Sequence, residues 1–108
     1  MSSLENDTVR RSDTETVEKV RPEFREPPLF RVLLHNDHYT TMDFVIEVLR
    51  GVFRKSIIEA TKIMLDVHRK GVGVVGAFTY DIARTRADRV HAMARKREFP
   101  LRCSVEKV

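Results

Sequence analysis

The chain has 108 residues, of which 42% are hydrophobic, so it has room for one packed domain around a single core. No apolar run approaches the roughly 18 residues that a membrane span requires, and we expect no membrane partner. Cys103 is the only cysteine, which excludes an internal disulfide and favours a reducing, cytoplasmic setting.

The net charge of +4 is unevenly distributed along the chain. Residues 1–26 contain seven acidic and five basic side chains, a net of −2, so residues 27–108 carry +6. A basic domain of this kind binds nucleic acid, binds an acidic protein, or is simply soluble, and the charge alone leaves all three open.

The segment 1–26 differs in composition from the rest of the chain. It is rich in Ser, Thr, Glu, Asp and Arg and shows almost no apolar periodicity. Such a segment buries too little surface to offset its ordering entropy, so we expect a disordered N-terminal tail. Pro27-Pro28 ends the tail with a stiff, extended joint, and residues 27–108 form the predicted domain.

The first predicted elements are a strand and a helix. Leu29–Leu34 is short, β-branched and aromatic, as in a buried strand, and a polar loop over 35–40 follows it. Thr40, with Asp43 three residues later, resembles a capping box and predicts the start of a helix. The helix is expected to end near Gly51, and its apolar stripe consists of Phe44, Val45, Val48, Leu49 and Val52.

A second helix and a second strand follow. Ser56 and Glu59 form a full capping box that opens the helix, and Gly71 ends it. Val72–Thr79 is an apolar strand whose internal glycines predict a bulge or a close backbone approach. The residues expected on one face of the helix are Ile57, Ala60, Met64, Val67 and His68.

The last elements complete the fold class. Thr79 caps a third helix that runs to about Arg97, with Asp81 well placed against its dipole. Leu101–Val108, beyond Pro100, alternates as a final strand. The order is βααβαβ, which predicts an α+β domain with three helices packed against a three-stranded, mostly antiparallel sheet.

Catalytic and metal motifs are missing from the sequence. There is no Gly-rich phosphate loop, no Gly-x-Ser-x-Gly elbow and no cysteine with the features of an activated nucleophile; we expect Cys103 in the core. His35 and His38 lack a matched third ligand, so no metal site is predicted. We therefore expect neither an enzyme nor a cofactor.

Two polar features allow alternative interpretations. The loop Asn36 to Thr40 is either local turn chemistry or a cup of oxygen acceptors for a cationic ligand. Met64, Val67 and His68 are either core residues with a satisfied histidine or one wall of a pocket, if the loop meets this helix. The basic residues of the third helix and just beyond are by default a solvated face, since exposed aromatics and a Gly-rich RNA clamp are missing: Arg84, Arg86, Arg89, Arg95, Lys96 and Arg97.

Four stretches of the sequence, over residues 32–49, 60–68, 71–79 and 100–107, resemble the ClpS adaptor family. They read Val-Leu-Leu-His-Asn-Asp-His-Tyr-Thr-Thr-Met-Asp-Phe-Val-Ile-Glu-Val-Leu, Ala-Thr-Lys-Ile-Met-Leu-Asp-Val-His, Gly-Val-Gly-Val-Val-Gly-Ala-Phe-Thr and Pro-Leu-Arg-Cys-Ser-Val-Glu-Lys. The resemblance covers about residues 30–108, and the tail lies outside it.

The resemblance implies a fold like that of the C-terminal domain of the ribosomal stalk protein. It also implies a cytoplasmic, monomeric adaptor that binds N-degron substrates by an N-terminal Phe, Tyr, Trp or Leu. Such adaptors hand their substrates to the N-terminal domain of a ClpA-type AAA+ unfoldase, which feeds the ClpP peptidase. Two alternative hypotheses remain. The protein could be a small basic RNA- or ribosome-associated domain, or an adaptor with a degenerate pocket that only modulates protease choice.

The resemblance also implies roles for individual residues. Asn36 and His68 would contact the substrate's α-amino group, with Asp37 supplying negative charge nearby. Asp81 and Arg86 would dock on the unfoldase, and Met42 would be a gate against β-branched residues. The side-chain pocket would be lined by Thr40, Met42, Val45, Met64, Val67 and Leu101.

The sequence departs from the family pattern at two positions. His38 stands where many members have a second Asp, so it modifies the field felt by the ammonium and repels it when protonated. Thr41 replaces a common Pro directly before Met42, which loosens the loop.

Overall fold

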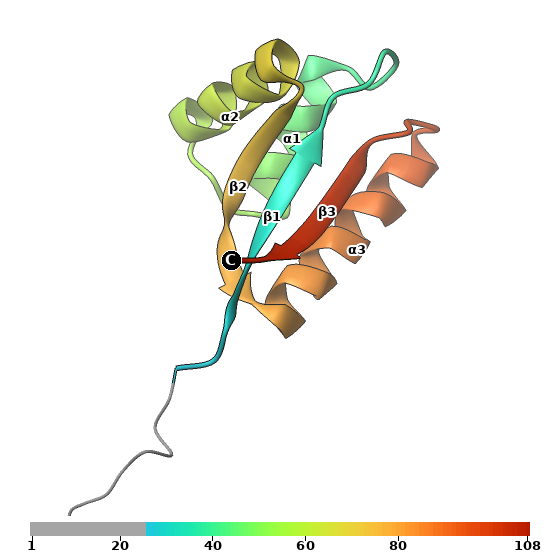
Figure 1. The fold of residues 1–108 in the computed structure, drawn as a ribbon. Helices are drawn as coiled ribbons and strands as arrows, with labels where there is room; N and C mark the ends of the chain where they lie inside the picture. Colours follow the sequence, from blue (N-terminus) through green and yellow to red (C-terminus); the bar gives the residue numbers. More distant parts are fainter. Residues whose placement is uncertain (1–25) are drawn as a thin grey trace, which may run out of the picture.

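The computed structural model describes residues 26–108, so the tail predicted over 1–26 lies outside the described residues except for Glu26. The order of elements is βααβαβ, as the sequence predicts (Figure 1). The final strand is one residue shorter at each end than expected. The elements are β1 (Leu29–His35), α1 (Met42–Gly51), α2 (Ile57–Lys70), β2 (Val72–Thr79), α3 (Tyr80–Lys96) and β3 (Arg102–Lys107).

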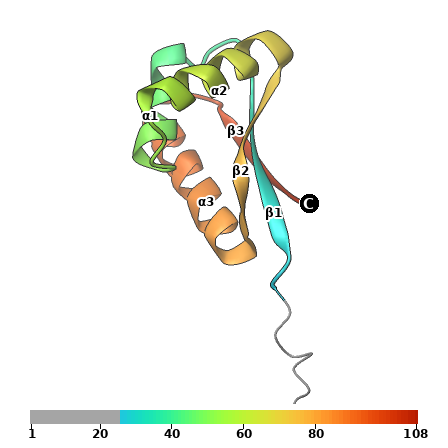
Figure 2. The same ribbon diagram turned by 90° about the vertical axis from the view of Figure 1, so that its left-hand side faces the viewer.

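The sheet has the strand order β2-β1-β3, and both pairings are antiparallel, so it is antiparallel throughout. The three helices lie on one side of it (Figure 2). The β1–β2 register shifts between Val32, opposite Gly76, and Leu33, opposite Val74. This irregularity falls beside a strand glycine, in agreement with the sequence-based prediction of a bulge.

The core fills the layer between the sheet and the helices. Residues of β1 and α1 provide most of its largest side chains, and Leu101 and Cys103 at the start of β3 complete it with 4% and 5% exposure. Burying each large apolar side chain contributes roughly 1.5–3 kcal/mol. The largest fully buried side chains are Phe44, Leu34, Leu49, Val32, Val48, Val52 and Val90.

The ends of α1 and α2 are fixed by side-chain caps. The Glu59 amide donates to Ser56 Oγ at 3.1 Å, which confirms the capping box of α2, and Gly71 ends that helix in the left-handed region at φ 88°. The N-cap of α1 is Thr41, whose Oγ1 accepts from the Phe44 amide at 3.1 Å. The prediction of a Thr40 cap was wrong by one residue, because the Thr40 hydroxyl donates to Asp37 instead.

The buried face of α2 is shorter at both ends than the sequence predicts. Ala60, Met64 and Val67 are buried, as predicted. Ile57 is 49% exposed and His68 is also exposed, so neither belongs to the buried face. At the start of α3, Thr79 occupies the N-cap position but makes no side-chain cap hydrogen bond.

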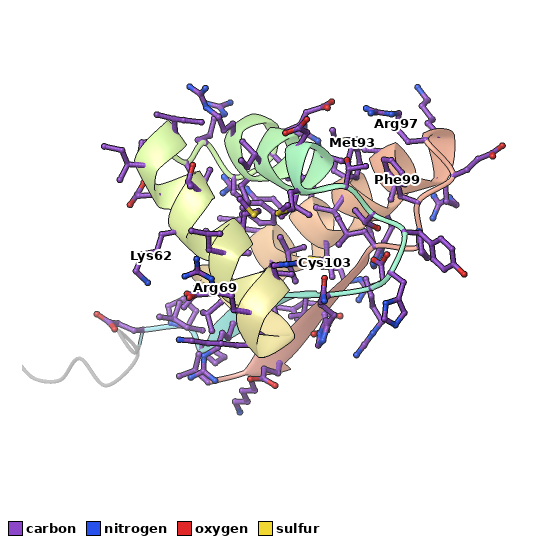
Figure 3. The ribbon with its side chains drawn as sticks, turned by 90° about the horizontal axis from the view of Figure 1, so that it is seen from above. Lys62, Arg69, Met93, Arg97, Phe99 and Cys103 are labelled. Carbon is purple, nitrogen blue, oxygen red and sulfur yellow. The ribbon has the colours of Figure 1, made fainter. Side chains whose placement is uncertain are left out.

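Arg97 joins the end of α3 to α1, and Figure 3 shows it beside Met93 and Phe99. Its guanidinium lies 5.1 Å from the ring centroid of Phe44 and 5.5 Å from that of Phe99. The same group donates to Glu47 Oε1 at 3.3 Å. A partly exposed cation–π contact contributes about 0.5–1 kcal/mol, so this cluster adds a small stabilisation to the packing of α1 against the end of α3.

Gly73 allows α2 to approach β2 closely. A Cβ at this position would lie 2.7 Å from Val67 Cγ2 and 3.0 Å from the Ile63 carbonyl oxygen. The sequence-based prediction of a close backbone approach is therefore confirmed here. No helix of residues 26–108 is long and apolar enough to cross a membrane.

We expect Gly73→Ala to lower the free energy of unfolding by about 1–3 kcal/mol, because the added methyl group collides with Val67 and with backbone. The measurement is urea denaturation followed by circular dichroism. Gly51→Ala is the matched control, since nothing lies within 4 Å of its Cβ position and the exchange favours a helix. Equal stability of the two variants would contradict the close approach.

Candidate functional site

A cavity of about 470 Å³ lies at one end of the sheet. Its walls come from the loop after β1, the start of α1 and the second half of α2, and this loop and the end of α2 lie at the same end of the molecule (Figure 1). The lining residues are Asn36, Asp37, His38, Thr40, Thr41, Met42, Val45, Met64, Val67 and His68.

A backbone hydrogen bond ties the loop to α2. The Asn36 amide donates to the Gly71 carbonyl at 2.9 Å, directly beyond the last residue of the helix. Gly71 reaches this position because its left-handed conformation turns the chain from α2 into β2. The question that the sequence left open is thus answered: the loop does meet the face of α2 that carries Met64, Val67 and His68.

Asp37 organises the loop from within. Its Oδ1 accepts from the Tyr39 amide at 2.7 Å and from the Thr40 amide at 2.6 Å, and its Oδ2 accepts from Thr40 Oγ1 at 2.7 Å. Burial alone would raise the pKa of Asp37, but the hydrogen bonds from Thr40 and Tyr39 and the nearby His38 outweigh it and hold the pKa below its usual value. The cavity therefore has a fixed negative charge at neutral pH.

The cavity has an apolar floor and a polar rim. Val45, Met64 and Val67 are 5%, 8% and 3% exposed and form the floor, whereas Met42 is 49% exposed at the mouth. Asn36 and His68 are exposed polar residues on the same walls. This arrangement fits a small ligand with a cationic group at one end and an apolar group at the other.

The structure gathers nearly all the residues that the sequence marked for this pocket. Leu101 is the exception, because it lies in the core with 4% exposure and is not among the residues that line the cavity. His38, marked as a modifier of the ligand field, is part of the wall. Thr41 also lines the cavity and was not predicted to do so; its signal in the sequence was an N-cap residue directly before Met42.

The family model described as "ATP-dependent Clp protease adaptor protein ClpS" matches residues 25–104. The chain belongs to the ClpS family. It is 53% identical to the ClpS adapter of Syntrophus aciditrophicus over 104 residues, which cover 96% of this chain and 97% of the relative. It is 58% identical to the ClpS adapter of Oleidesulfovibrio alaskensis over 86 residues, which cover 80% and 83% of the two chains.

A solved ClpS structure is similar to this one. It is that of Agrobacterium tumefaciens ClpS2 bound to L-phenylalaninamide, with a TM-score of 0.74 and 37% sequence identity. The similarity covers 77% of this chain and 100% of the other. ClpS membership and this shared fold agree with the resemblance seen in the sequence.

A second, smaller hollow of about 240 Å³ lies on the first turns of α3 in this ClpS family member. Asp81 and Arg86 line it together with Ile82 and Thr85. The Arg86 guanidinium lies 5.2 Å from the Phe78 ring centroid, and Ile82 is 44% exposed. The two residues marked for unfoldase docking thus share one partly apolar surface, far along the chain from the first cavity.

The remaining reactive groups of this ClpS domain have structural surroundings. Burial raises the pKa of Cys103 to about 12, with a smaller opposing effect from Arg84. His91 Nε2 accepts a hydrogen bond from the Cys103 backbone amide at 3.0 Å. This nitrogen is therefore bonded to the backbone of β3 and does not activate the thiol. The predicted core position of Cys103 is confirmed.

A histidine and a serine meet on β1 and β3, where His35 Nε2 lies 2.7 Å from Ser104 Oγ. The other ring nitrogen of His35 faces an Arg102 guanidinium nitrogen at 3.4 Å, where a catalytic dyad has a carboxylate. Burial and then Arg102 lower the pKa of His35. This pair is a cross-strand contact. Among residues 26–108, no three His, Cys, Asp or Glu side chains gather to hold a metal ion.

Proposed function

We propose that this ClpS family member is an N-degron adaptor, which captures proteins by their N-terminal residue and delivers them to a Clp protease. The observation that carries the proposal is one cavity with a charged polar rim and an apolar floor. The ligand of the related ClpS2, L-phenylalaninamide, combines a free amino group with an aromatic side chain. These are the two groups that such a cavity complements.

The proposed contacts follow from the chemistry of the walls. Asn36 and His68 accept hydrogen bonds from the α-ammonium group, and Asp37 supplies the negative charge. Thr40, Val45, Met64 and Val67 surround the apolar side chain, with Met42 as the gate. Methionines suit a pocket for both aromatic and branched shapes. Leu101 is left out of the proposed contacts because it is buried and does not line the cavity.

The energies agree with a pocket that needs both ends of the ligand. A hydrogen bond to a charged group contributes roughly 1.5–3 kcal/mol, and burying a Phe or Leu side chain contributes a similar amount. Low-micromolar binding requires about 8 kcal/mol at the standard state. At mid-range values of about 2 kcal/mol each, three charge-assisted hydrogen bonds and one buried side chain reach this value together, whereas neither group reaches it alone.

Delivery is proposed to use the other end of the sheet. Asp81 and Arg86 dock on the N-terminal domain of a ClpA-type AAA+ unfoldase in the cytoplasm, and residues 1–26 form a separate handle ahead of the domain. β1 begins at Leu29, which pairs with Thr79, the N-cap of α3. The first residue of β1 therefore lies at the end of the sheet that carries the proposed docking surface, and the cavity loop follows the other end of this strand.

The RNA-associated alternative is weakened by the local contacts of the basic residues on α3. Arg84 pairs with Asp88 at 3.3 Å, Arg97 pairs with Glu47 at 3.3 Å, and Arg86 stacks on Phe78. Side chains that are engaged in this way are less available to phosphates. We therefore propose a non-enzymatic protein-binding role and no nucleic-acid partner.

A fluorescence-anisotropy titration tests the proposed function. We expect a labelled peptide that starts with Phe to bind with a dissociation constant in the low-micromolar range or below. N-acetylation removes the ammonium group and should weaken binding at least about tenfold. If the protein binds neither peptide, the pocket is degenerate. If it instead binds a labelled RNA oligonucleotide in a salt-dependent manner, the RNA alternative holds.

The gate is tested by Met42→Ala. This variant should bind peptides that start with Val or Ile, because the β-branch no longer collides with the methionine side chain at the pocket mouth. Anisotropy with a series of peptides that differ only in the first residue is the measurement. Ile58→Ala is the control, since Ile58 is 79% exposed on α2 and does not line the cavity. Unchanged rejection of Val and Ile by Met42→Ala removes Met42 from this role.

The handle is tested by removing residues 1–20. The truncated protein should bind the Phe peptide as tightly as the full chain, because the described lining of the cavity lies within residues 36–68. Degradation of a substrate starting with Phe, by a reconstituted ClpA-type unfoldase and ClpP, should be slower. Equal degradation rates with both forms would show that these residues have no part in delivery.

A further inference from the structure

We propose that Asp37 is also a positioning residue, which sets the place of Met42 at the pocket mouth and thereby the selectivity among apolar N-terminal residues. This inference rests on the proposed function of the cavity. It adds a second role to the negative charge already assigned to Asp37. The two roles make different predictions, because charge acts on the ammonium group and positioning acts on the side-chain gate.

The carboxylate of Asp37 is mostly committed to its own loop. A carboxylate has about four acceptor sites. Three of them are taken by the Tyr39 amide, the Thr40 amide and the Thr40 hydroxyl, at 2.6–2.7 Å. These are short hydrogen bonds of the charge-assisted kind, so the loop conformation depends strongly on them. One acceptor site is left for a ligand.

Side-chain packing does not hold this part of the loop. Tyr39 is 75% exposed, and His38 is exposed as well. Before the loop, the chain is fixed by the bond from the Asn36 amide to Gly71. Between that point and Thr41, the described side-chain hydrogen bonds that hold the loop are those to Asp37.

Thr40 links the loop that Asp37 holds to Met42, the proposed gate. It is followed by Thr41, whose hydroxyl caps α1 through the amide of the buried Phe44, and then by Met42, the first residue of the helix. Met42 therefore stands between a segment fixed by Asp37 and a helix fixed in the core. If the Asp37 bonds are lost, the chain that leads into Met42 loses its fixed direction, and the gate loosens.

Substitutions at position 37 separate the two roles. Asp37→Asn removes the charge, but its side-chain oxygen still accepts from the two backbone amides and its NH₂ group can donate to the Thr40 oxygen. Asp37→Ala removes both the charge and the ties. Thr40→Val keeps the carboxylate and removes only the hydroxyl bond, and Thr40→Ser restores that bond.

The test compares binding of peptides that differ only in a first residue of Phe, Leu, Val or Ile. Loss of charge weakens all four by one factor, since all share the ammonium group. We expect this uniform loss for Asp37→Asn, with the Phe-to-Val affinity ratio within about twofold of the original protein. For Asp37→Ala we expect that ratio to fall at least fivefold. Because Thr40 itself lines the cavity, Thr40→Val and Thr40→Ser are compared by amide hydrogen exchange alone. A fivefold fall corresponds to about 1 kcal/mol.

Amide hydrogen exchange provides a readout that does not need a ligand. The Tyr39 and Thr40 amides should exchange faster in Asp37→Ala than in Asp37→Asn or the unaltered protein. If all variants keep the same Phe-to-Val ratio and the same exchange rates, Asp37 acts only through its charge and the proposal is overturned. If the unaltered protein binds no peptide, the proposed function fails, while the exchange rates still decide whether Asp37 positions the loop.

Discussion

β1 is hydrogen-bonded along both edges, to β2 over Leu29–His35 and to β3 over Phe30–His35. Its inward side chains, Val32 and Leu34, are fully buried under the helices. The two proposed binding surfaces lie at opposite ends of this strand. The cavity loop follows His35, and the α3 surface lies beside Thr79, which pairs with Leu29. At about 3.4 Å per residue, the strand holds these surfaces roughly 20 Å apart. On the proposed function, a captured N-terminus and a docked unfoldase would therefore not compete for space.

The cavity itself depends on the contact between α2 and the loop. The small residue at position 73 brings α2 down onto the sheet, and the Gly71 turn then brings the end of the helix within hydrogen-bonding distance of Asn36. The apolar floor comes from the buried faces of α1 and α2 that also build the core. Selectivity and stability are thus linked, since a change that lifts α2 also widens the pocket.

Much of this fold was predictable because its signals are local. The Ser56–Glu59 box and Gly71 fix both ends of α2 within a few residues of sequence. The N-cap of α1 was not predictable in the same way, since Thr40 and Thr41 are equally good caps and only the competing carboxylate of Asp37 decides between them. The meeting of the loop with α2 is a non-local contact. A resemblance could point to it, but periodicity could not.

Within residues 26–108, the outer edges of β2 and β3 pair with no further strand, and an edge strand with unpaired backbone groups can join another chain. β2 has no charged residue to discourage such pairing, but its register shift beside Gly76 breaks the straight line of donors and acceptors that an incoming strand needs. On the opposite edge strand, β3, the backbone amide of Cys103 already donates a hydrogen bond to the imidazole of His91. The proposed function brings this sheet close to unfolded polypeptides, whose extended segments can pair with an edge strand. The register shift in β2 and the His91 contact on β3 therefore reduce the tendency of both edge strands to pair with a substrate chain.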